Sequence, residues 1–318
     1  MLRPGHSAPR KASTEQIAAV KRVVRQQQNE VLKLSTEQME ALLPHLDKAQ
    51  AEMQSKLARW IETAPDGELR WSAQHYRNAL VMLHATQQKL HEAMNNQLEE
   101  AAPVAQGVAI DHLTESLARF SGIFEQSVSP IKLNKAALIA DGQSYLIHRI
   151  QTSAARYAGY VGRDIQHRLI MDIATGSPVS KTIDRLVADG GPKGWVALKG
   201  IAGENNAVVE WIPEGLFTRY RDRAEMVVRT EFSSAYCMQA RDARREAGKT
   251  IKGLQKKWMA DGAGCSDKCL PVHDQTVAEY EMYDTPVGPL FDPPAHPRCG
   301  CSSIAWKSDW PDILGDLL

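Results

Sequence analysis

The residues best suited to chemistry lie close together near the C-terminal end of the chain. Cys265 and Cys269 are followed, after 26 further residues, by His-Pro-Arg-Cys-Gly-Cys at 296–301, so four of the five cysteines fall within 37 residues. A closed structural zinc site takes four thiolate or imidazole ligands, typically two from each of two turns. We therefore expect the intervening segment to form a hairpin that brings its two ends around a structural Zn²⁺. The candidate ligands are Cys265, Cys269, His296, Cys299 and Cys301.

The same cysteines have two other common uses, which are disulfide bonds and unligated buried thiols. The cysteine count is odd, the spacing is clustered, and the first residues do not resemble a secretory signal. These features favour synthesis in a reducing cytoplasm, and hence zinc over disulfides. Cys265, Cys269 and Cys299 are the first choices as ligands, and His296 and Cys301 compete for the fourth position.

Residues that flank the cysteines are expected to support the site. Pro293, Pro294 and Pro297 hold the backbone of the ligand loop extended and lower the entropy lost when the loop becomes ordered. Trp258 and Asp261 precede the first cysteines with a Trp-x-x-Asp spacing. We expect Trp258 to pack beneath the site and Asp261 to accept hydrogen bonds from amides of the ligand loop.

Upstream, residues 217–247 carry a helical pattern with Arg229-Thr-Glu231 near its centre. Side chains two residues apart on a helix project in different directions, so Arg229 and Glu231 each face a different partner. Residues 219–257 hold 11 basic and 5 acidic side chains, a net charge of +6. This stretch predicts contact with DNA or with an acidic partner surface, and a solvated helix face explains the charge equally well. The predicted contact residues are Arg219, Arg221, Arg223, Arg241, Arg244, Arg245, Lys249, Lys252, Lys256 and Lys257.

The whole chain has 318 residues, with 38 basic side chains, 38 acidic ones and 6% aromatic residues. The zero net charge conceals blocks of opposite sign, of which residues 258–318, with 3 basic and 10 acidic side chains, are the most acidic. This composition excludes a collagen-like or wholly disordered chain, and the few aromatic residues argue against an aromatic-rich β-sandwich. No run of 18 apolar residues occurs, so we expect no membrane span.

The elements that must position these residues are predicted to be mostly helices. Capping boxes beginning at Ser13 and at Ser35 indicate two helix starts, and Pro44 should kink or restart the second helix. A turn at 65–67 precedes a long helix that should end at 103–107. Further helical stripes continue to about residue 169. The histidines of this half are scattered singly, as surface or boundary residues are. Glycines then indicate a loop-rich stretch with one strand at about 207–212.

The motifs together resemble a known family, the phage head morphogenesis domain typified by the phage Mu F minor head protein. The resemblance covers about residues 170–305. It departs from the usual pattern at Gly300, where arginine is common, and in the three residues that separate Cys265 from Cys269. The residues that carry it are Arg229-x-Glu231, Trp258-x-x-Asp261, Cys265-x-x-x-Cys269 and Pro293-Pro294-x-His296-Pro297-x-Cys299-x-Cys301.

The resemblance implies a minor head (capsid) protein of a tailed phage, made in the host cytoplasm and present in few copies in the phage head or virion. Such proteins act in head morphogenesis at the portal vertex or the capsid interior, and no enzymatic activity is implied. The expected partners are the portal protein and the major capsid or scaffolding protein, with non-specific contact with double-stranded phage DNA. No membrane is involved.

We therefore expect a mainly α protein that has an extended N-terminal helical region and a small α+β Cys/His-rich C-terminal domain. The predicted divisions are a flexible tail at 1–12, a helical region at 13–170, the head morphogenesis domain at 171–305 and a C-terminal tail at 306–318.

The alternative function is a metal-dependent nuclease of the ββα-metal type, because His273-Asp274 and His296 lie near the cysteines. Hydrolysis of this kind needs a general base and an open metal position. A closed, cysteine-rich ligand set is typical of structural zinc instead, and it favours the binding role.

Overall fold

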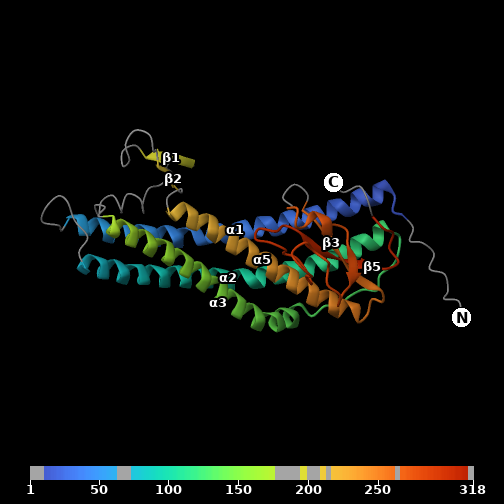
Figure 1. Cartoon of the computed structure of the whole chain (residues 1–318). Coiled ribbons are helices and arrows are strands. Elements are labelled where there is room, and N and C mark those ends of the chain that lie inside the picture. The colour runs from blue at the N-terminus through green and yellow to red at the C-terminus, as the bar shows by residue number, and fades with distance from the viewer. Residues whose placement is uncertain are drawn as a thin grey trace. The chain divides into compact units, whose positions relative to one another are not determined.

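The computed structural model describes residues 11–62, 73–175, 194–198, 208–212, 216–261 and 266–313. Within these ranges the chain is mainly helical (Figure 1), with the long helices α1 (Thr14–Glu62), α2 (Ala73–Ile123), α3 (Lys135–Ala174) and α5 (Leu216–Gly248). The shorter elements are β1 (Gly194–Leu198), β2 (Val208–Ile212), β3 (Leu254–Met259), η2 (Leu270–Val272), β4 (Thr276–Ala278) and β5 (Ser302–Lys307). The prediction of a mainly α chain with a small sheet in a Cys-rich C-terminal region is confirmed.

The chain forms two compact units, and each unit draws on segments that are far apart in the sequence. Unit 1 comprises Met1–Gln38, Leu98–Ile150 and Val228–Leu318, and unit 2 comprises Met39–Gln97 and Gln151–Val227. The sequence-based division between residues 170 and 171 differs from this one. The difference arises because each unit is assembled from parts of several helices, and a boundary drawn along the sequence cannot represent that arrangement.

Helix α1 begins with the predicted capping box. The backbone N–H of Gln16 donates to Ser13 Oγ at 3.2 Å, and the N–H of Ser13 donates to Gln16 Oε1 at 3.0 Å. The second predicted start, at Ser35, is wrong, because α1 continues unbroken through Ser35 and Pro44. Ser35 Oγ instead donates to the carbonyl oxygen of Leu32. A serine inside a helix commonly satisfies its hydroxyl in this way.

Helix α2 passes through Pro103 and Gly107, where the sequence predicts an end. A proline inside a helix removes one backbone hydrogen bond and costs about 3 kcal/mol. Burial on both sides of Pro103 offsets this cost, since Ala101, Ala102 and Ala105 are at most 7% exposed. The separate helix predicted beyond this point is therefore the C-terminal part of α2.

Within unit 1, β3 is the central strand of a three-stranded antiparallel sheet with the order β4-β3-β5. Gln255 of β3 lies opposite Ala278 of β4 and Trp306 of β5. The strand predicted at 207–212 is confirmed as β2, which pairs antiparallel with β1. The glycine-rich loop between these two strands lies outside the described residues.

Residues beyond 305 belong to the core of unit 1, so the predicted C-terminal tail is wrong for the described part. Trp306 and Trp310 are at most 3% exposed, and their rings meet edge to face at 5.4 Å. Both rings also contact Phe120 and Phe124 of α2. The backbone N–H of Ala12 donates to the same segment, and this bond orders the end of the predicted N-terminal tail. Several of the chain's few aromatic residues are thus concentrated in one place.

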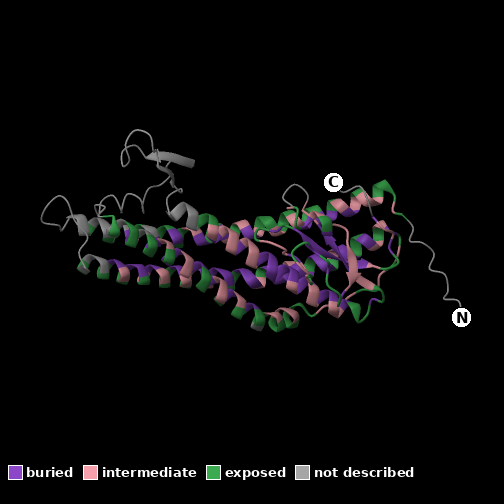
Figure 2. Cartoon of the chain, in the orientation of Figure 1, coloured by how far each residue is buried: buried purple, intermediate pink, exposed green. Residues whose placement is uncertain are grey.

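Buried residues of unit 1 gather on the helix faces that meet the sheet (Figure 2). This core includes Val20 and Val24 of α1, Leu113 and Leu117 of α2, Ala243 and Ala247 of α5, and Ile304 of β5. In unit 2 the buried side chains follow helical spacing and include Leu42, Met53, Leu83, Leu90, Tyr157, Val161 and Ile165. The sheet and the C-terminal part of α5 therefore share one core, and this core supports the cysteine-bearing loops.

Candidate metal centre

Three cysteines from two distant loops meet beside the sheet. Cys269 immediately precedes η2, and Cys299 and Cys301 lie in the loop that leads into β5. Their Sγ atoms all lie within 4.8 Å of one another, and each side chain is at most 5% exposed. Together with Trp258, Val272 and Tyr283 they form a small buried cluster that is separate from the main core of unit 1. The predicted hairpin therefore brings both ends of the motif together.

The sulfur geometry suits a tetrahedral metal. Cys269 Sγ lies 3.7 Å from Cys299 Sγ. Two thiolates on a tetrahedral zinc, each with a Zn–S bond of about 2.3 Å, lie about 3.8 Å apart. A disulfide would bring the sulfurs to about 2.05 Å, and Cys269, Cys299 and Cys301 are not disulfide-bonded. The Cys269–Cys299 pair thus stands at the separation that zinc requires, and the Cys301 sulfur lies within 4.8 Å of both.

The surroundings of Cys299 favour its thiolate. A hydrogen bond from the Cys301 thiol is the largest cause that lowers the pKa of Cys299, and backbone groups of Ala295 and Cys301 add to it. These contacts outweigh the opposing effect of burial and lower the pKa to about 5. Metals bind the thiolate form, so this environment prepares Cys299 as a ligand.

His296 has the protonation pattern of a metal-binding histidine. Its Nδ1 lies 2.8 Å from the carbonyl oxygen of Pro297, which can only accept, so Nδ1 carries the proton of the neutral ring. The lone pair then belongs to Nε2, which is buried and has no hydrogen-bond partner among the described residues. Histidines that bind metals commonly donate the other ring proton to a carbonyl in this way. The imidazole does not, however, belong to the group of three sulfurs.

Cys265 lies outside the described residues. The structure therefore brings together Cys269, Cys299 and Cys301, and it leaves His296 and Cys265 as the two candidates for a fourth ligand. Cys301, which the sequence places in competition with His296, belongs to the central group.

His273 forms a hydrogen bond with the backbone. Its Nδ1 accepts a hydrogen bond from the N–H of Ala260 at 3.0 Å, so the proton of the neutral ring is on Nε2. Burial lowers the pKa of His273, and this keeps the ring neutral. The ring joins the end of β3 to the turn before β4, and it is not part of the sulfur group.

Trp258 packs within the cysteine cluster, and Asp261 lies against the Cys-x-Cys loop. Trp258 is fully buried in the cysteine cluster and meets the Tyr283 ring edge to face at 5.1 Å, as predicted. Asp261 lies against the Cys-x-Cys loop, because a Cβ added at Gly300 would lie 2.4 Å from Asp261 Oδ2. Only glycine fits between the two ligand cysteines without displacing this carboxylate.

The predicted proline scaffold borders the ligand loop. Pro293 is buried, Pro297 is exposed, and the Pro293–Pro294 peptide bond is cis. Arg298, between Pro297 and Cys299, has a φ of 60°, in the left-handed region. Its N–H donates to Thr230 Oγ1 of α5 at 3.3 Å, which anchors the loop to the helix.

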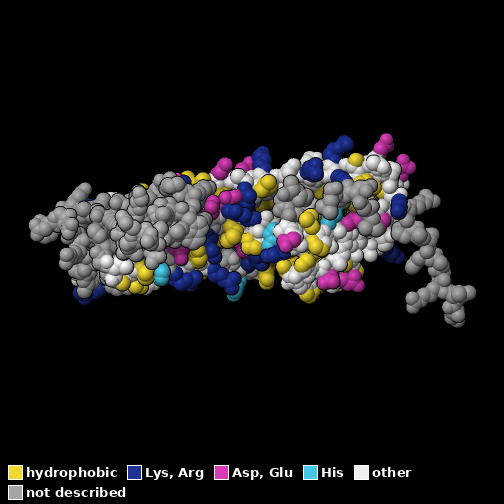
Figure 3. Space-filling view, turned by 45° about the horizontal axis from the view of Figure 1, so that its top comes forward, with side chains coloured by type: hydrophobic (Ala, Val, Ile, Leu, Met, Phe, Trp, Pro, Cys, Tyr) yellow, Lys and Arg dark blue, Asp and Glu magenta, His cyan; other side chains and the backbone are white. Residues whose placement is uncertain are grey.

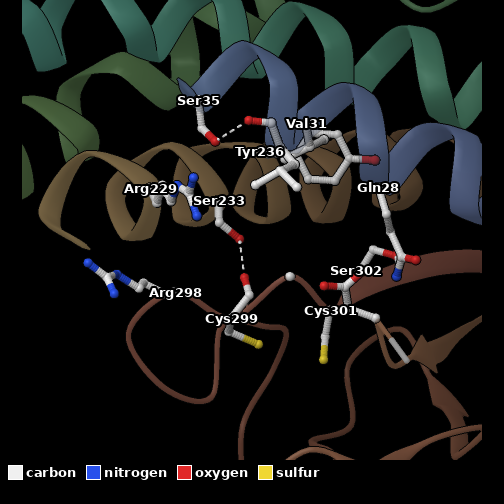
Figure 4. A pocket seen from close by; sticks show the side chains of 13 residues that line it. Gln28, Val31, Ser35, Arg229, Ser233, Tyr236, Arg298, Cys299, Cys301 and Ser302 are labelled. Atoms are coloured by element: carbon white, nitrogen blue, oxygen red, sulfur yellow. Dashed lines mark hydrogen bonds between the residues drawn. The ribbon is translucent and has the colours of Figure 1, made fainter. Parts of the chain in front are cut away.

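Behind the Cys-x-Cys loop, unit 1 contains a cavity of about 260 Å³ (Figure 4). Helix α1 contributes residues spaced along one face, α5 contributes Arg229, Ser233 and Tyr236, and the loop contributes its own backbone. Glu231 turns away from this cavity and pairs with Arg149 of α3. Arg229 lines the cavity and Glu231 does not, so the two side chains face different surroundings, as their spacing predicts. Sequence reasoning missed the contribution of α1, because Gln28 and Ser35 are separated from the cysteines by more than 200 residues.

The predicted basic contact surface is wrong for three of its residues, because they are buried. The helix α5 ends at Gly248, so Lys256 and Lys257 lie in β3. Arg244, Lys256 and Lys257 are at most 1% exposed and cannot contact DNA. Arg244 donates to Glu279 at 2.9 Å and to Asp292 at 2.7 Å, whereas the sequence pattern suggested only a run of surface charge.

On the face shown in Figure 3, Lys and Arg side chains (dark blue) are scattered among Asp and Glu side chains (magenta). The remaining described basic residues of that stretch either have side-chain partners or are exposed. Arg221 pairs with Asp47, and the Arg223 guanidinium lies 3.5 Å above the Tyr160 ring. Arg241 and Arg245 pair with Asp242, Lys249 pairs with Glu246, and Lys252 is exposed. The side chain of Arg219 lies outside the described residues.

Along the described helices, no 18-residue stretch is apolar enough to cross a bilayer. No family model matches the chain, and no curated protein or solved structure does so either.

Proposed function

We propose that this chain is a minor head protein of a tailed phage, and that it acts in head morphogenesis by binding other head proteins. The observation that carries the proposal is the convergence of the motif residues. Trp258, Asp261 and three cysteines come from separate strands and loops, and Arg229 comes from α5, yet all border the sulfur cluster or the cavity beside it. This convergence supports a shared role for the motif residues, which the proposal requires.

A structural zinc ion is part of the proposal. Cys269, Cys299 and Cys301 supply three thiolates, and His296 or Cys265 supplies the fourth ligand. When bound, zinc would cross-link the turn before η2 to the loop before β5. Apparent binding free energies of about 10–16 kcal/mol are typical of zinc in small zinc-finger peptides. A binding free energy of that order is large enough to hold in place loops that contain so little regular structure.

The proposed role is non-enzymatic. Four protein ligands leave zinc no open position for a water or substrate, which hydrolysis would require. The imidazole of His273, which the nuclease alternative would use as a base, accepts a backbone N–H through Nδ1. Binding to the portal, major capsid or scaffolding protein is therefore the activity that we propose.

Metal analysis tests the zinc site. Protein purified without chelators should contain about one zinc per chain, and Cys269→Ser and Cys301→Ser should each reduce the content to less than about one fifth. Cys237→Ala is the matched control, because Cys237 is equally buried but stands outside the sulfur group. A wild-type zinc content below half an equivalent, or retention of zinc in the Cys269→Ser protein, would refute the site.

Head assembly tests the function. Antibody detection in purified procapsids and virions should find the protein in a few copies per particle. A pull-down against the portal, major capsid and scaffolding proteins should retain at least one of the three. Absence of the protein from both particles, or failure to bind any of the three partners, would overturn the proposal. Contact with packaged DNA stays a prediction, now restricted to exposed residues such as Lys252.

A further inference from the structure

The cavity behind the Cys-x-Cys loop is the feature that the proposed zinc site does not use. In Figure 4 the sulfurs of Cys299 and Cys301 point away from the helices, so the backbone of residues 299–301 forms the floor of the cavity. The opposite walls are α1 and α5, with side chains at helical spacing on each. The metal cluster and the cavity therefore lie on opposite sides of one loop.

The lining of the cavity changes from one end to the other. Arg229 and Arg298 lie at one end in Figure 4, and Gln28 and Ser302 lie at the other. The second end is closed by hydrogen bonds, because Gln28 Nε2 donates to Ser302 Oγ at 3.2 Å and to the carbonyl oxygen of Met259 at 3.1 Å. The cationic groups of the lining therefore stand at the end opposite these hydrogen bonds.

Apolar surface separates the two ends. Val31 of α1 and the ring of Tyr236 lie between the two ends in Figure 4, and Leu32 also lines the cavity. Ser233 stands one helical turn after Arg229 on the same face of α5. The volume of about 260 Å³ equals roughly nine water molecules. This space accommodates an acidic side chain with a methylene stem, but it is small for a drug-sized ligand.

We infer that this cavity is a binding site for a carboxylate of a partner protein, held by Arg229 and Arg298 with its aliphatic stem against Val31, Leu32 and Tyr236. A guanidinium carries five N–H donors in a planar fork, so an arginine that already has one partner can still bind a carboxylate. The inference deepens the proposed function and rests on it for the nature of the partner, an acidic segment of a head protein.

Charge on the lining is consistent with this ligand. Asp261 also borders the cavity, so the lining holds two cationic side chains and one carboxylate. Asp261 lies against Gly300 of the floor, whereas Arg298 is exposed and Arg229 is half-buried. An incoming carboxylate meets the exposed guanidinium first and the half-buried one next.

The test uses the zinc-loaded full chain and three short peptides followed by NMR of the arginine Nε–H groups. The peptides are acetyl-Gly-Glu-Gly-amide, acetyl-Gly-Gly-Gly with a free C-terminus, and acetyl-Gly-Gln-Gly-amide as the uncharged control. The signals of Arg229 and Arg298 should shift with at least one of the two charged peptides and should stay in place with the control. The peptide that shifts them tells whether a side chain or a chain terminus is the ligand.

Variants then separate binding from a structural role. Arg229→Gln should weaken binding by about tenfold, as expected for the loss of a charged hydrogen bond, whereas Arg241→Gln, on the same helix but outside the cavity, should leave it unchanged. Absence of shifts with both charged peptides overturns the inference, and incorporation into procapsids would still support the proposed function. If Arg229→Gln and Arg298→Gln instead lower zinc content without changing peptide binding, the arginines serve to balance the thiolates and the inference is overturned.

Discussion

At the scale of single residues, one close contact beside the sulfur cluster determines which residue can occupy position 300. Gly300 separates the two ligand cysteines of the loop, and the Asp261 carboxylate occupies the space where any other residue would place its Cβ. Glycine is therefore the residue that this close approach requires at position 300.

Gly300→Ala should destabilise the zinc-loaded protein by about 1–3 kcal/mol, because its Cβ would overlap Asp261 Oδ2. Urea unfolding followed by tryptophan fluorescence measures the change in the free energy of unfolding. Asp261→Ala in the same chain should recover most of the loss. If the double variant is as unstable as the sum of the two single variants, the steric explanation is wrong.

The fourth ligand can be identified by exchanging zinc for cobalt, whose absorption reports the number of thiolates. Three sulfurs stand together and a structural zinc takes four ligands, so one further residue is needed. His296→Gln and Cys265→Ser should therefore have unequal effects, with one variant losing metal affinity by about tenfold or more and the other retaining it. Equal affinity in both variants, whether lost or retained, would contradict a site built from three sulfurs and one of these residues.

At the scale of elements, the packing of α3 against α2 in unit 2 includes a close approach at a glycine. Gly162 of α3 lies against Gln87 of α2, and a Cβ at 162 would lie 1.3 Å from Gln87 Nε2. Gly159 lies one turn earlier in the same helix and has open space around it. The two glycines are therefore a matched pair with opposite expected behaviour.

Gly162→Ala should lower the free energy of unfolding by about 1 kcal/mol, because Gln87 must leave its position. Gly159→Ala should raise it by about 0.5–1 kcal/mol, since alanine is the better helix former. Thermal unfolding followed by circular dichroism measures both changes. A stabilising effect of Gly162→Ala would show that Gln87 moves without cost.

A buried ionic network joins α5 to the segments around the sheet in unit 1. Arg244 is 1% exposed and donates to Glu279, to Asp292 and, at 2.8 Å, to the carbonyl oxygen of Ser303 in β5. Burial raises the pKa of Glu279, and Arg244 opposes this effect. Arg244 thus offsets part of the free-energy cost of burying two carboxylates.

Arg244→Met should destabilise the protein by about 3–5 kcal/mol, because it leaves two buried carboxylates without their cation. Arg245→Met, at the next position on a half-exposed site, should cost less than about 1 kcal/mol. Urea unfolding of the two variants at neutral pH provides the comparison. Similar losses of unfolding free energy in both variants would show that the burial of Arg244 with its two carboxylate partners contributes little.

At the scale of the whole molecule, the proposed zinc and the helices stabilise different parts. The long helices α1, α2, α3 and α5 carry none of the candidate ligands that the structure describes. Cys269 lies next to η2, and His296, Cys299 and Cys301 lie in the loop before β5. Loss of metal should therefore affect the loops and the Trp258 cluster first, and the helices much less.

Removal of zinc with a strong chelator should leave most of the far-ultraviolet helical signal and change the near-ultraviolet tryptophan signal, because Trp258 packs against the cysteines. Circular dichroism in both ranges, before and after chelation, is the measurement. Re-addition of zinc, but not of magnesium, should restore the tryptophan signal. Loss of the helical signal in parallel with zinc would contradict this separation.

The sequence by itself determined the features that depend on local spacing. Hydrophobic periodicity predicted a mainly helical chain, the capping box at Ser13 predicted the start of α1, and the clustered cysteines predicted that both loops meet. The predicted helix end at Pro103 is wrong, and the helix does not restart at Pro44, because burial of neighbouring residues offsets the local cost of proline.

Only the tertiary structure decided which charges are buried and what lies beside the metal cluster. A run of basic residues from 219 to 257 gives the same pattern whether Arg244 and Lys257 face solvent or carboxylates of other segments. The same holds for Lys256, which donates to the carbonyl oxygen of Phe291. The cavity depends on α1, whose residues precede the cysteines by more than 200 positions. Contacts between such distant segments are set by packing, since helical periodicity specifies the face of each helix but not the element that will cover it.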